Sequence, residues 1–255
     1  MRILLTNDDG IFADGIFALY QQVKSLGEVT VVAPAVEQSA AGHAITLYHP
    51  LRVKKVTRER GFKGYALNGT PADCVKFAVS SLSHFSPDLV ISGINQGANT
   101  GVSVYYSGTI SAAREGFINR IPAVAVSLAS PHFLDFRAAV SITRRIVRAY
   151  AKGVFPSSVM LNVNVPPLPA KKIKGIKITR QAPSRFIEEF LPQKQKGGKK
   201  VYSLVGEIEL YSPDGTSDEE AVAEGFISIT PLKLDLTDYD IMPRFAKWAR
   251  NGGAR

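Results

Sequence analysis

The sequence predicts an α/β protein built on a mainly parallel β-sheet with helices packed against it. Three observations favour this class. Short apolar runs alternate with segments of helical periodicity from the N-terminus to about residue 165. The predicted helices carry capping and stop signals near their ends. A chain of 255 residues with 45% hydrophobic content can also bury a full core.

The first elements alternate strand, helix and strand. Residues 3–6 form an apolar run that predicts the first strand, and residues 29–33 predict the second. Asp14 is placed to cap a helix that Gly27 stops. The loop over residues 34–44 is longer than an ordinary connection, which is typical of a functional loop. The apolar residues of the helix recur at helical spacing: Ile16, Leu19, Tyr20, Val23 and Leu26.

The middle of the chain continues the alternation. Residues 45–67 predict short strands, and Thr70 followed by Pro71 begins a helix that runs to about Leu82. Ser107 is a capping residue for a helix that ends near Ile118. The remaining elements are strands over 89–92, 123–127 and 159–165, a Gly- and Asn-rich segment over 93–101, and an amphipathic helix over 135–151.

The regular alternation fades beyond about Pro183. We therefore divide the chain into a first domain over 1–182 and a C-terminal appendage, or arm, over 183–255. Gly197 and Gly198 lie between two β-like runs, which predicts a hairpin. A strand over 226–230 and a terminal helix around Arg244 complete the arm.

Composition excludes several classes of protein. No apolar stretch is long enough to span a membrane, and the single cysteine, Cys74, is typical of a reducing compartment, so we expect a cytoplasmic location and no membrane partner. The net charge of +9 is concentrated in Lys171–Lys174, in Lys194–Lys200 and around Arg144, Arg145 and Arg148. Nucleic-acid binding is one interpretation of such clusters. Because aromatic residues are not interleaved with the lysines, we favour solvated surface and expect no stable nucleic-acid partner.

Two adjacent carboxylates, Asp8 and Asp9, follow the first strand, where a nucleotide-binding α/β protein normally presents glycines to a phosphate. Two ionised carboxylates about 4 Å apart repel by about 4 kcal/mol at an effective dielectric constant of 20. A divalent cation would relieve that repulsion, so the pair predicts a metal site. The alternative interpretation is that Asp8 and Asp9 are capping acids near a helix N-terminus, where negative charges interact favourably with the helix dipole.

Two further oxygen donors follow other strands of the predicted sheet. Ser39 lies in the long loop after the second strand, and Asn95 follows the strand over 89–92. The carboxyl ends of parallel strands meet at one edge of a sheet, so these groups are expected to converge on Asp8 and Asp9. An all-oxygen set suits Mg²⁺, Mn²⁺ or Ca²⁺. The histidines form no pair at ligand spacing, which argues against zinc.

Ser107, Gly108 and Thr109 predict a second half of the site. Hydroxyl and N–H groups at the start of a helix bind anions, and Gly108 allows close approach of the backbone. A metal on one side and an anion pocket on the other indicate a phosphate between them. The sequence thus predicts two separate halves, one for the cation and one for the phosphate.

These segments resemble the SurE (survival protein E) nucleotidases, and the resemblance extends in order from the first residues to beyond residue 230. The matching motifs are Thr6–Ile11, Gln38–Thr46, Gly69–Lys76, Ser92–Gly101, Ser107–Thr109, Leu161–Pro166 and Ser228–Leu232.

The resemblance implies a Rossmann-like three-layer sandwich with a C-terminal arm of hairpin and helix, assembled as a homodimer or homotetramer. It implies a metal-dependent phosphomonoesterase of nucleoside 5'- and 3'-monophosphates, in some members also active on short polyphosphate. One divalent cation per subunit would be bound by Asp8, Asp9, Ser39 and Asn95. The substrate would be bound by Asn95, Ser107, Gly108 and Thr109.

We expect Asp8 and Asp9 to be the catalytic residues, with Asp8 orienting or deprotonating the attacking water. An aspartyl-phosphate route is disfavoured because the two acids are contiguous. Two other classes are considered. A zinc deacetylase would need histidines that the sequence does not supply, and a non-catalytic nucleotide-binding module would retain the fold without releasing phosphate.

Overall fold

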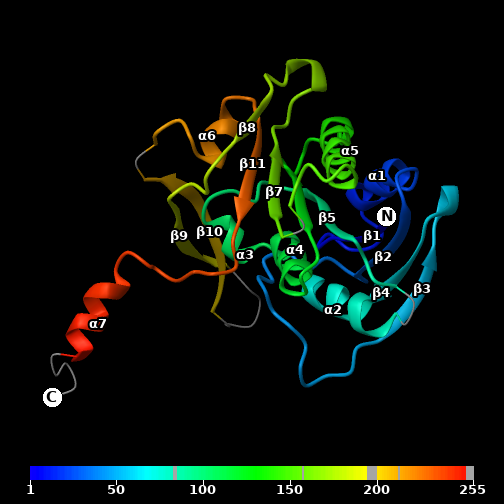
Figure 1. The fold of residues 1–255 in the computed structure, drawn as a ribbon, viewed down its shortest axis with the longest axis horizontal. Helices are drawn as coiled ribbons and strands as arrows, with labels where there is room; N and C mark the ends of the chain where they lie inside the picture. The colour runs from blue at the N-terminus through cyan, green and yellow to red at the C-terminus, as the bar shows by residue number, and fades with distance from the viewer. Residues whose placement is uncertain (83–84, 157, 194–199, 212, 251–255) are drawn as a thin grey trace.

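The computed structural model describes residues 1–82, 85–156, 158–193, 200–211 and 213–250 (Figure 1). Most of its strands belong to one sheet: β1 (Arg2–Thr6), β2 (Glu28–Pro34), β3 (Val53–Thr57), β4 (Lys63–Leu67), β5 (Leu89–Gln96), β6 (Ala123–Leu128), β7 (Met160–Val165), β8 (Ile176–Ile178) and β11 (Ile227–Leu232). The helices are α1 (Asp14–Val23), α2 (Pro71–Ser81), α3 (Ser103–Tyr106), α4 (Gly108–Ile118), α5 (Arg137–Ala151), α6 (Asp218–Ala223) and α7 (Met242–Arg250).

The sheet has the order β3-β4-β2-β1-β5-β6-β7-β11-β8. Strand β1 lies between β2 and β5 and is parallel to both. The pairs β2–β4, β5–β6, β6–β7 and β8–β11 are also parallel, whereas β3–β4 and β7–β11 are antiparallel. The predicted α/β class with a mainly parallel sheet is confirmed.

Helices cover both faces of this sheet. In β1, Ile3 and Leu5 pack in one core cluster with α1 and α5, whereas Leu4 packs in a second cluster with α2 and α4. This alternation follows from the two-residue period of a strand, which buries both faces when helices lie on each side. The result is a three-layer sandwich. Cys74 is buried in the second cluster, as expected for a small core residue.

Two of the predicted helix caps are confirmed. Thr70 Oγ1 accepts from the backbone N–H of Asp73 (3.1 Å), and Asp73 Oδ2 accepts from the N–H of Thr70 (2.9 Å), which forms a capping box. Ser107 Oγ accepts from the N–H of Ile110 (3.1 Å). These bonds satisfy N–H groups that a helix leaves unpaired in its first turn.

The third predicted cap is wrong. Ala13, with an extended backbone, occupies the capping position, and Asp14 is the first residue of α1. No side chain makes a capping hydrogen bond at this helix end. A negative charge in the first turn still interacts favourably with the helix dipole. Two short helices, α3 and α6, were not predicted, because fewer than two turns give no readable apolar period.

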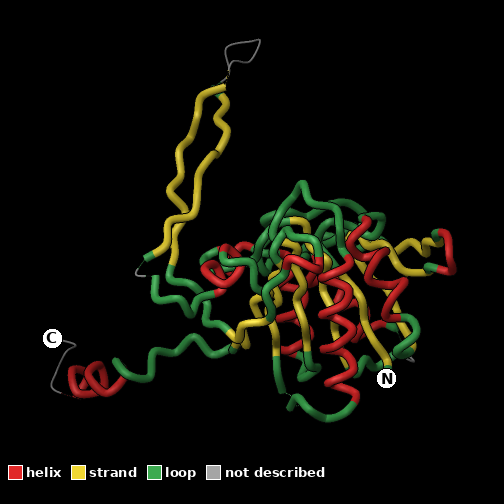
Figure 2. Tube along the Cα trace, turned by 90° about the horizontal axis from the view of Figure 1, so that it is seen from above, coloured by secondary structure: helices red, strands yellow, loops and turns green. Residues whose placement is uncertain are grey.

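The C-terminal residues leave the body and return to it. Strands β9 (Ser184–Gln193) and β10 (Val201–Leu210) form a long antiparallel hairpin that projects from the sandwich (Figure 2). The predicted Gly197–Gly198 turn lies outside the described residues. The chain then returns through α6 to β11, which pairs with β7 and β8 inside the main sheet. Helix α7 extends away from the body on a separate segment (Figures 1 and 2).

No helix within the described part of the chain is both long enough and apolar enough to cross a membrane.

Candidate active site

Strand β1 lies at the point where the order of strands in the sheet changes direction. The chain passes from β1 to β2 on one side and later to β5 on the other. Ligands of open parallel sheets bind at the carboxyl ends of the strands beside such a reversal. The carboxyl ends of β1, β2 and β5 therefore lie where a ligand is expected. The acids and Ser39 lie in the loops after β1 and β2, whereas Asn95 lies inside β5, which extends to Gln96 and not only to the predicted Ser92.

Asp8 is buried at the end of β1 and held by the start of α4. Thr109 Oγ1 donates a hydrogen bond to Asp8 Oδ1 across 2.5 Å, and the Thr109 side chain is fully buried. Burial raises the pKa of Asp8, and the bond from Thr109 opposes that rise. A single hydroxyl thus connects the predicted metal half to the predicted phosphate half. The two predicted halves are therefore not separate, because Thr109 of one half binds Asp8 of the other.

Gly108 makes this contact between α4 and the acid loop possible. A Cβ atom at this position would lie 2.7 Å from Asp8 Cβ and 2.9 Å from Asp8 Oδ2. Separations below about 3 Å between non-bonded carbons are repulsive. The absence of a side chain therefore allows the N-terminus of α4 to lie directly against Asp8. The sequence predicted a different role for this glycine, close approach of the backbone to the ligand.

Asp9 carries an unsatisfied buried oxygen. Its Oδ2 atom has no hydrogen-bond partner within the described residues. Burial, followed by the charge of Asp8, raises the pKa of Asp9 to about 7, while the backbone N–H of Gln96 opposes the shift. An unpaired buried acceptor costs about 1–3 kcal/mol, and more when it is charged. A cation would satisfy this oxygen and relieve the repulsion from Asp8.

Asn95 lies near the end of β5, and Ser39 lies on the loop after β2, so the two residues come from the strands on either side of β1. Asn95 Nδ2 donates to the carbonyl oxygen of Gly97 (2.8 Å), so Oδ1 is the atom left to bind a cation. The loop that carries Ser39 is joined to the acid loop because the N–H of Gln38 donates to the carbonyl oxygen of Asp8 (2.8 Å). Ser39 Oγ is itself exposed and donates to the Glu37 carboxylate.

Glu37 was not singled out by the sequence analysis. Its charge contributes to the raised pKa values of both Asp8 and Asp9, and its carboxylate accepts from Ser39. Glu37 therefore adds a third negative charge close to Asp8 and Asp9. A lone glutamate in a polar loop gives no signal in the sequence, because its relation to the other acids depends on how the loop folds back.

Within the described residues, histidine, cysteine, aspartate and glutamate form no group of three that could hold a metal. A cation at Asp8 and Asp9 would therefore need other donors, and the hydroxyl of Ser39 and the amide of Asn95 supply oxygens of the required type. Carboxylate, hydroxyl and amide oxygens suit hard cations such as Mg²⁺ and Mn²⁺. The donor set fits the predicted group.

The start of α4 offers donors for an anion. The backbone N–H groups of Gly108 and Thr109 belong to the first turn of an 11-residue helix, where N–H groups have no partner within the helix. Ser107 is buried, and its oxygen already accepts the capping bond. Of the three residues predicted to bind phosphate, Gly108 and Thr109 lie next to Asp8, and Ser107 immediately precedes them as the capping residue of the helix.

A buried asparagine network supports the loop after β5. The N–H of Asn99 donates to Asn164 Oδ1 (2.8 Å), and Asn99 Nδ2 donates to Ser127 Oγ (2.8 Å). Asn162 Nδ2 donates to the carbonyl oxygen of Asn99 (2.7 Å). These asparagines lie in the matching motifs Ser92–Gly101 and Leu161–Pro166, but the sequence did not predict that they contact one another. The available signal was a pair of amides alternating with apolar residues in β7, a fully buried strand.

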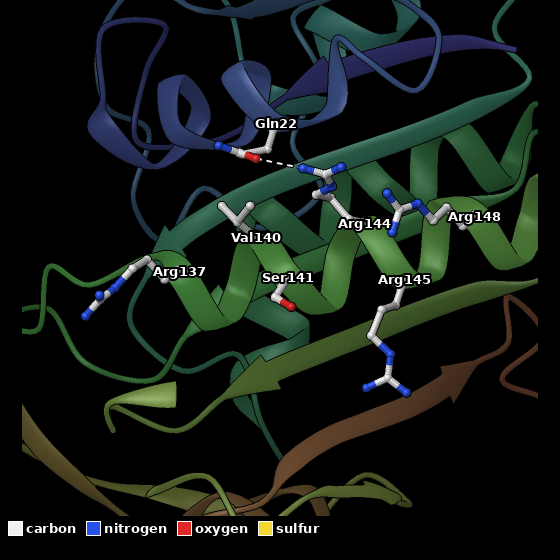
Figure 3. A pocket seen from close by; sticks show the side chains of 7 residues that line it. All are labelled: Gln22, Arg137, Val140, Ser141, Arg144, Arg145 and Arg148. Carbon is white, nitrogen blue, oxygen red and sulfur yellow. Dashed lines mark hydrogen bonds between the residues drawn. The ribbon is translucent and has the colours of Figure 1, made fainter. Parts of the chain in front are cut away.

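A separate hollow of about 390 Å³ lies along the outer side of α5 (Figure 3). None of the predicted site residues lines it, and Arg144 donates to Gln22 Oε1 (2.8 Å). Arg145 and Arg148 are exposed, and the expectation that this cluster binds no nucleic acid stays a prediction. The lining residues are Gln22, Arg137, Val140, Ser141, Arg144, Arg145 and Arg148.

The chain is similar to known proteins over nearly its whole length. Residues 3–188 match the family model described as Survival protein SurE. The chain is 49% identical to a protein of Syntrophobacter fumaroxidans over 97% of this chain and 99% of the relative, and 47% identical to one of Syntrophus aciditrophicus over 95% and 91%. Both relatives are named 5'-nucleotidase SurE. The crystal structure of the Aquifex aeolicus SurE protein superposes with a TM-score of 0.83 at 39% identity, covering 98% of this chain and all of that one.

Proposed function

The chain belongs to the SurE family, and from that membership and the site geometry we propose that it is a divalent-metal-dependent phosphomonoesterase of nucleoside monophosphates. The observation that carries this proposal is the buried Asp8–Asp9 pair. One oxygen of Asp9 is unsatisfied, and the N-terminus of α4 lies directly against Asp8. A cation site and an anion site are therefore adjacent, as hydrolysis of a phosphate ester requires.

Asp8, Asp9, Ser39 and Asn95 would hold the cation, here Mg²⁺ or Mn²⁺, with Ca²⁺ as a further candidate. When bound, the cation would polarise a phosphoryl oxygen, offset its charge and lower the pKa of a nearby water. Ser39 now donates to Glu37, so its hydroxyl must turn away from that carboxylate to reach the cation. Thr109 holds Asp8 in one orientation for the same purpose.

The chain's own groups then position the substrate. The N–H groups of Gly108 and Thr109, with the Ser107 hydroxyl, would bind the phosphoryl oxygens, and the Asn95 amide would face the same group. Asp8 is our choice for the residue that orients the attacking water, because its fixed carboxylate lies beside the phosphate pocket. In-line attack then releases the nucleoside and inorganic phosphate.

We assign nucleoside 5'-monophosphates as substrates, supported by the names of the relatives at 47–49% identity. We also propose activity on 3'-monophosphates and on short polyphosphate. A phosphate pocket built from a helix N-terminus binds the phosphoryl group and not the sugar, so it would accept either ester position. The cytoplasmic location expected from the single cysteine remains a prediction.

A second copy of this chain is the partner that we propose for the C-terminal arm. Helix α7 buries none of its residues against the body, and its apolar side chains lie beside one another along a hollow of about 360 Å³. Phe245 is 60% exposed and Trp248 is 59% exposed. Two large aromatic residues on one helix face are typical of a surface that a partner covers. A homodimer is the simplest such assembly, and a homotetramer could use the hairpin in addition.

The test is release of inorganic phosphate from a panel of nucleoside monophosphates, 5' and 3', and from tripolyphosphate, after removal of metal with EDTA. We expect no release without metal and recovery of activity with Mg²⁺ or Mn²⁺. Full hydrolysis in metal-free buffer would exclude the proposed mechanism. Nucleotide binding without phosphate release at any metal concentration would instead identify a non-catalytic binding module.

A further inference from the structure

The segment that carries Ser39 has no helix or strand of its own to fix it. Residues 35–52, between β2 and β3, contain only turns and irregular backbone, and Ser39 is exposed. Ala40 and Gly42 both have positive φ values, 54° and 57°, so the chain turns sharply on either side of Ala41. A metal ligand on such a loop is positioned only if other contacts hold the loop in place.

One contact comes from a buried carboxylate that the proposed chemistry does not use. Glu115 lies on α4, and its side chain is only 3% exposed. His43 Nε2 donates to Glu115 Oε2 (3.1 Å), while Lys76 Nζ (3.0 Å) and Asn119 Nδ2 (3.0 Å) donate to Oε1. One oxygen therefore binds the loop, and the other binds the helices. A buried carboxylate is costly without partners, so this arrangement strongly favours one position of His43.

Backbone bonds secure the loop around His43. The N–H of Gly42 donates to the carbonyl oxygen of Tyr106 (2.9 Å), and Thr70 Oγ1 donates to the carbonyl oxygen of Ala44 (2.7 Å). On the other side of Ser39, the N–H of Gln38 donates to Asp8. Ser39 thus lies between an anchor on the acid loop and an anchor on α4, the helix that also forms the phosphate pocket.

We propose that His43 and Glu115 are positioning residues for the cation site, because their bond holds the loop in the conformation from which Ser39 reaches the cation. This inference rests on the proposed function, which assigns Ser39 as a ligand. The same helix, α4, then fixes three parts of the site: Thr109 holds Asp8, the first turn binds phosphate, and Glu115 holds the Ser39 loop. Neither His43 nor Glu115 is assigned contact with the substrate.

The first measurement is hydrogen exchange in the metal-free protein, which needs no activity. His43→Ala should accelerate exchange of the Gly42 and Gln38 amides at least about tenfold, because a hydrogen bond to a charged group contributes about 1.5–3 kcal/mol. His43→Gln places an amide nitrogen near the position of Nε2 and should restore most of the protection. Unchanged exchange in His43→Ala overturns the proposal, whatever the activity.

The second measurement is calorimetric titration with Mn²⁺. His43→Ala should weaken Mn²⁺ binding about tenfold, and saturating Mn²⁺ should restore most of kcat, because only the population of the correct loop conformation has changed. In a Ser39→Ala background, the His43→Ala substitution should have no further effect on Mn²⁺ affinity. An equal loss in both backgrounds would show that His43 does not act through Ser39, and would overturn the proposal.

Asn119→Ala is the matched control. It removes one partner of Glu115 but leaves the bond to His43 in place, so it should lower the melting temperature without changing Mn²⁺ affinity by more than about twofold. A loss equal to that of His43→Ala would mean that the cluster only stabilises the fold. Wild-type protein that binds Mn²⁺ but releases no phosphate would overturn the proposed function and leave the positioning role intact. Wild-type protein that does not bind Mn²⁺ would overturn both.

Discussion

The hydroxyl of Thr109 donates to the carboxylate of Asp8 across 2.5 Å, which joins the first turn of α4 to the end of β1. Both residues are buried, so the bond is shielded from water. It makes the proposed phosphate pocket and the proposed cation site parts of one rigid unit. A change on α4 is therefore expected to affect cation binding as well as substrate binding.

Thr109→Val keeps the size of the side chain and removes the hydroxyl. One charge-assisted hydrogen bond contributes about 1.5–3 kcal/mol of interaction free energy. Its loss should therefore lower kcat/KM about 10- to 100-fold. Because Asp8 loses its orienting partner, Mn²⁺ affinity should fall as well. Thr109→Ser retains the hydroxyl and should keep most of both. Steady-state kinetics and calorimetry decide, and a Val variant with normal Mn²⁺ binding would confine Thr109 to the phosphate pocket.

Asp9→Asn removes one charge of the pair. Activity should fall on the order of 100-fold or more, as for loss of a preorganised electrostatic group. In EDTA at pH 8 the same variant should melt at a higher temperature than the wild type, because burial and the charge of Asp8 disfavour the ionised Asp9 carboxylate. Asp14→Asn, at an exposed position, is the control for both measurements. Near-normal turnover would leave the pair with a structural role only.

Gly108→Ala should separate activity from stability. The added methyl group would contact Asp8 at 2.7 Å, so the acid must shift, and kcat/KM should fall by about 100-fold or more. Gly116→Ala on the same helix would instead meet Val90 in the core at 2.6 Å. Overpacking of that kind costs about 1–3 kcal/mol of stability. Kinetics and thermal melts on both variants test the distinction, which fails if Gly116→Ala is the less active of the two below its melting temperature.

The Glu115 carboxylate predicts a pH-dependent contribution to stability. The hydrogen bond from His43, followed by that from Lys76, lowers the pKa of Glu115 below its usual value of 4.5. Because the pKa of Glu115 is lower in the folded than in the unfolded protein, its ionised carboxylate stabilises the fold at pH values above the pKa of the unfolded state. This contribution is lost as the pH falls through the pKa of the folded state. Glu115→Gln should therefore destabilise the protein more at pH 7 than at about pH 3.5.

Urea unfolding at the two pH values measures this difference. Glu224→Gln, which removes an exposed ion pair with Lys177, is the control and should cost less than about 1 kcal/mol at either pH. An equal loss at both pH values in Glu115→Gln would show that the ionised carboxylate contributes nothing beyond its shape.

The apolar face of α7 predicts the oligomeric state. Replacing Phe245 and Trp248 together by Glu should dissociate a dimer built through this helix, because two charges would be buried in the interface. Lys247→Glu, on the opposite side of the helix, should leave the assembly unchanged. Sedimentation gives the mass and phosphate release gives the rate per site. An unchanged mass for the double variant would exclude α7 as the contact.

The sequence by itself determined the α/β class and most of the elements along the chain. Alternating apolar runs fixed the order of strands and helices because buried parallel strands and their covering helices have different periods. Thr70 and Ser107 indicated where α2 and α4 begin, since capping depends on groups within three residues. Asp8 and Asp9 stood out for a similar local reason: adjacent acids after a strand are unusual without a counter-charge.

Only the tertiary structure decided how distant groups meet. The bond between Thr109 and Asp8 joins residues 101 positions apart, and that between His43 and Glu115 joins residues 72 apart. Periodicity and capping carry no record of such contacts, because they depend on how loops pack after the sheet has formed. The position of β11 inside the main sheet was decided in the same way. A short strand near the C-terminus has no local feature that predicts which strands it pairs with. Its pairing with β7 and β8 depends on the edge that the rest of the sheet leaves open.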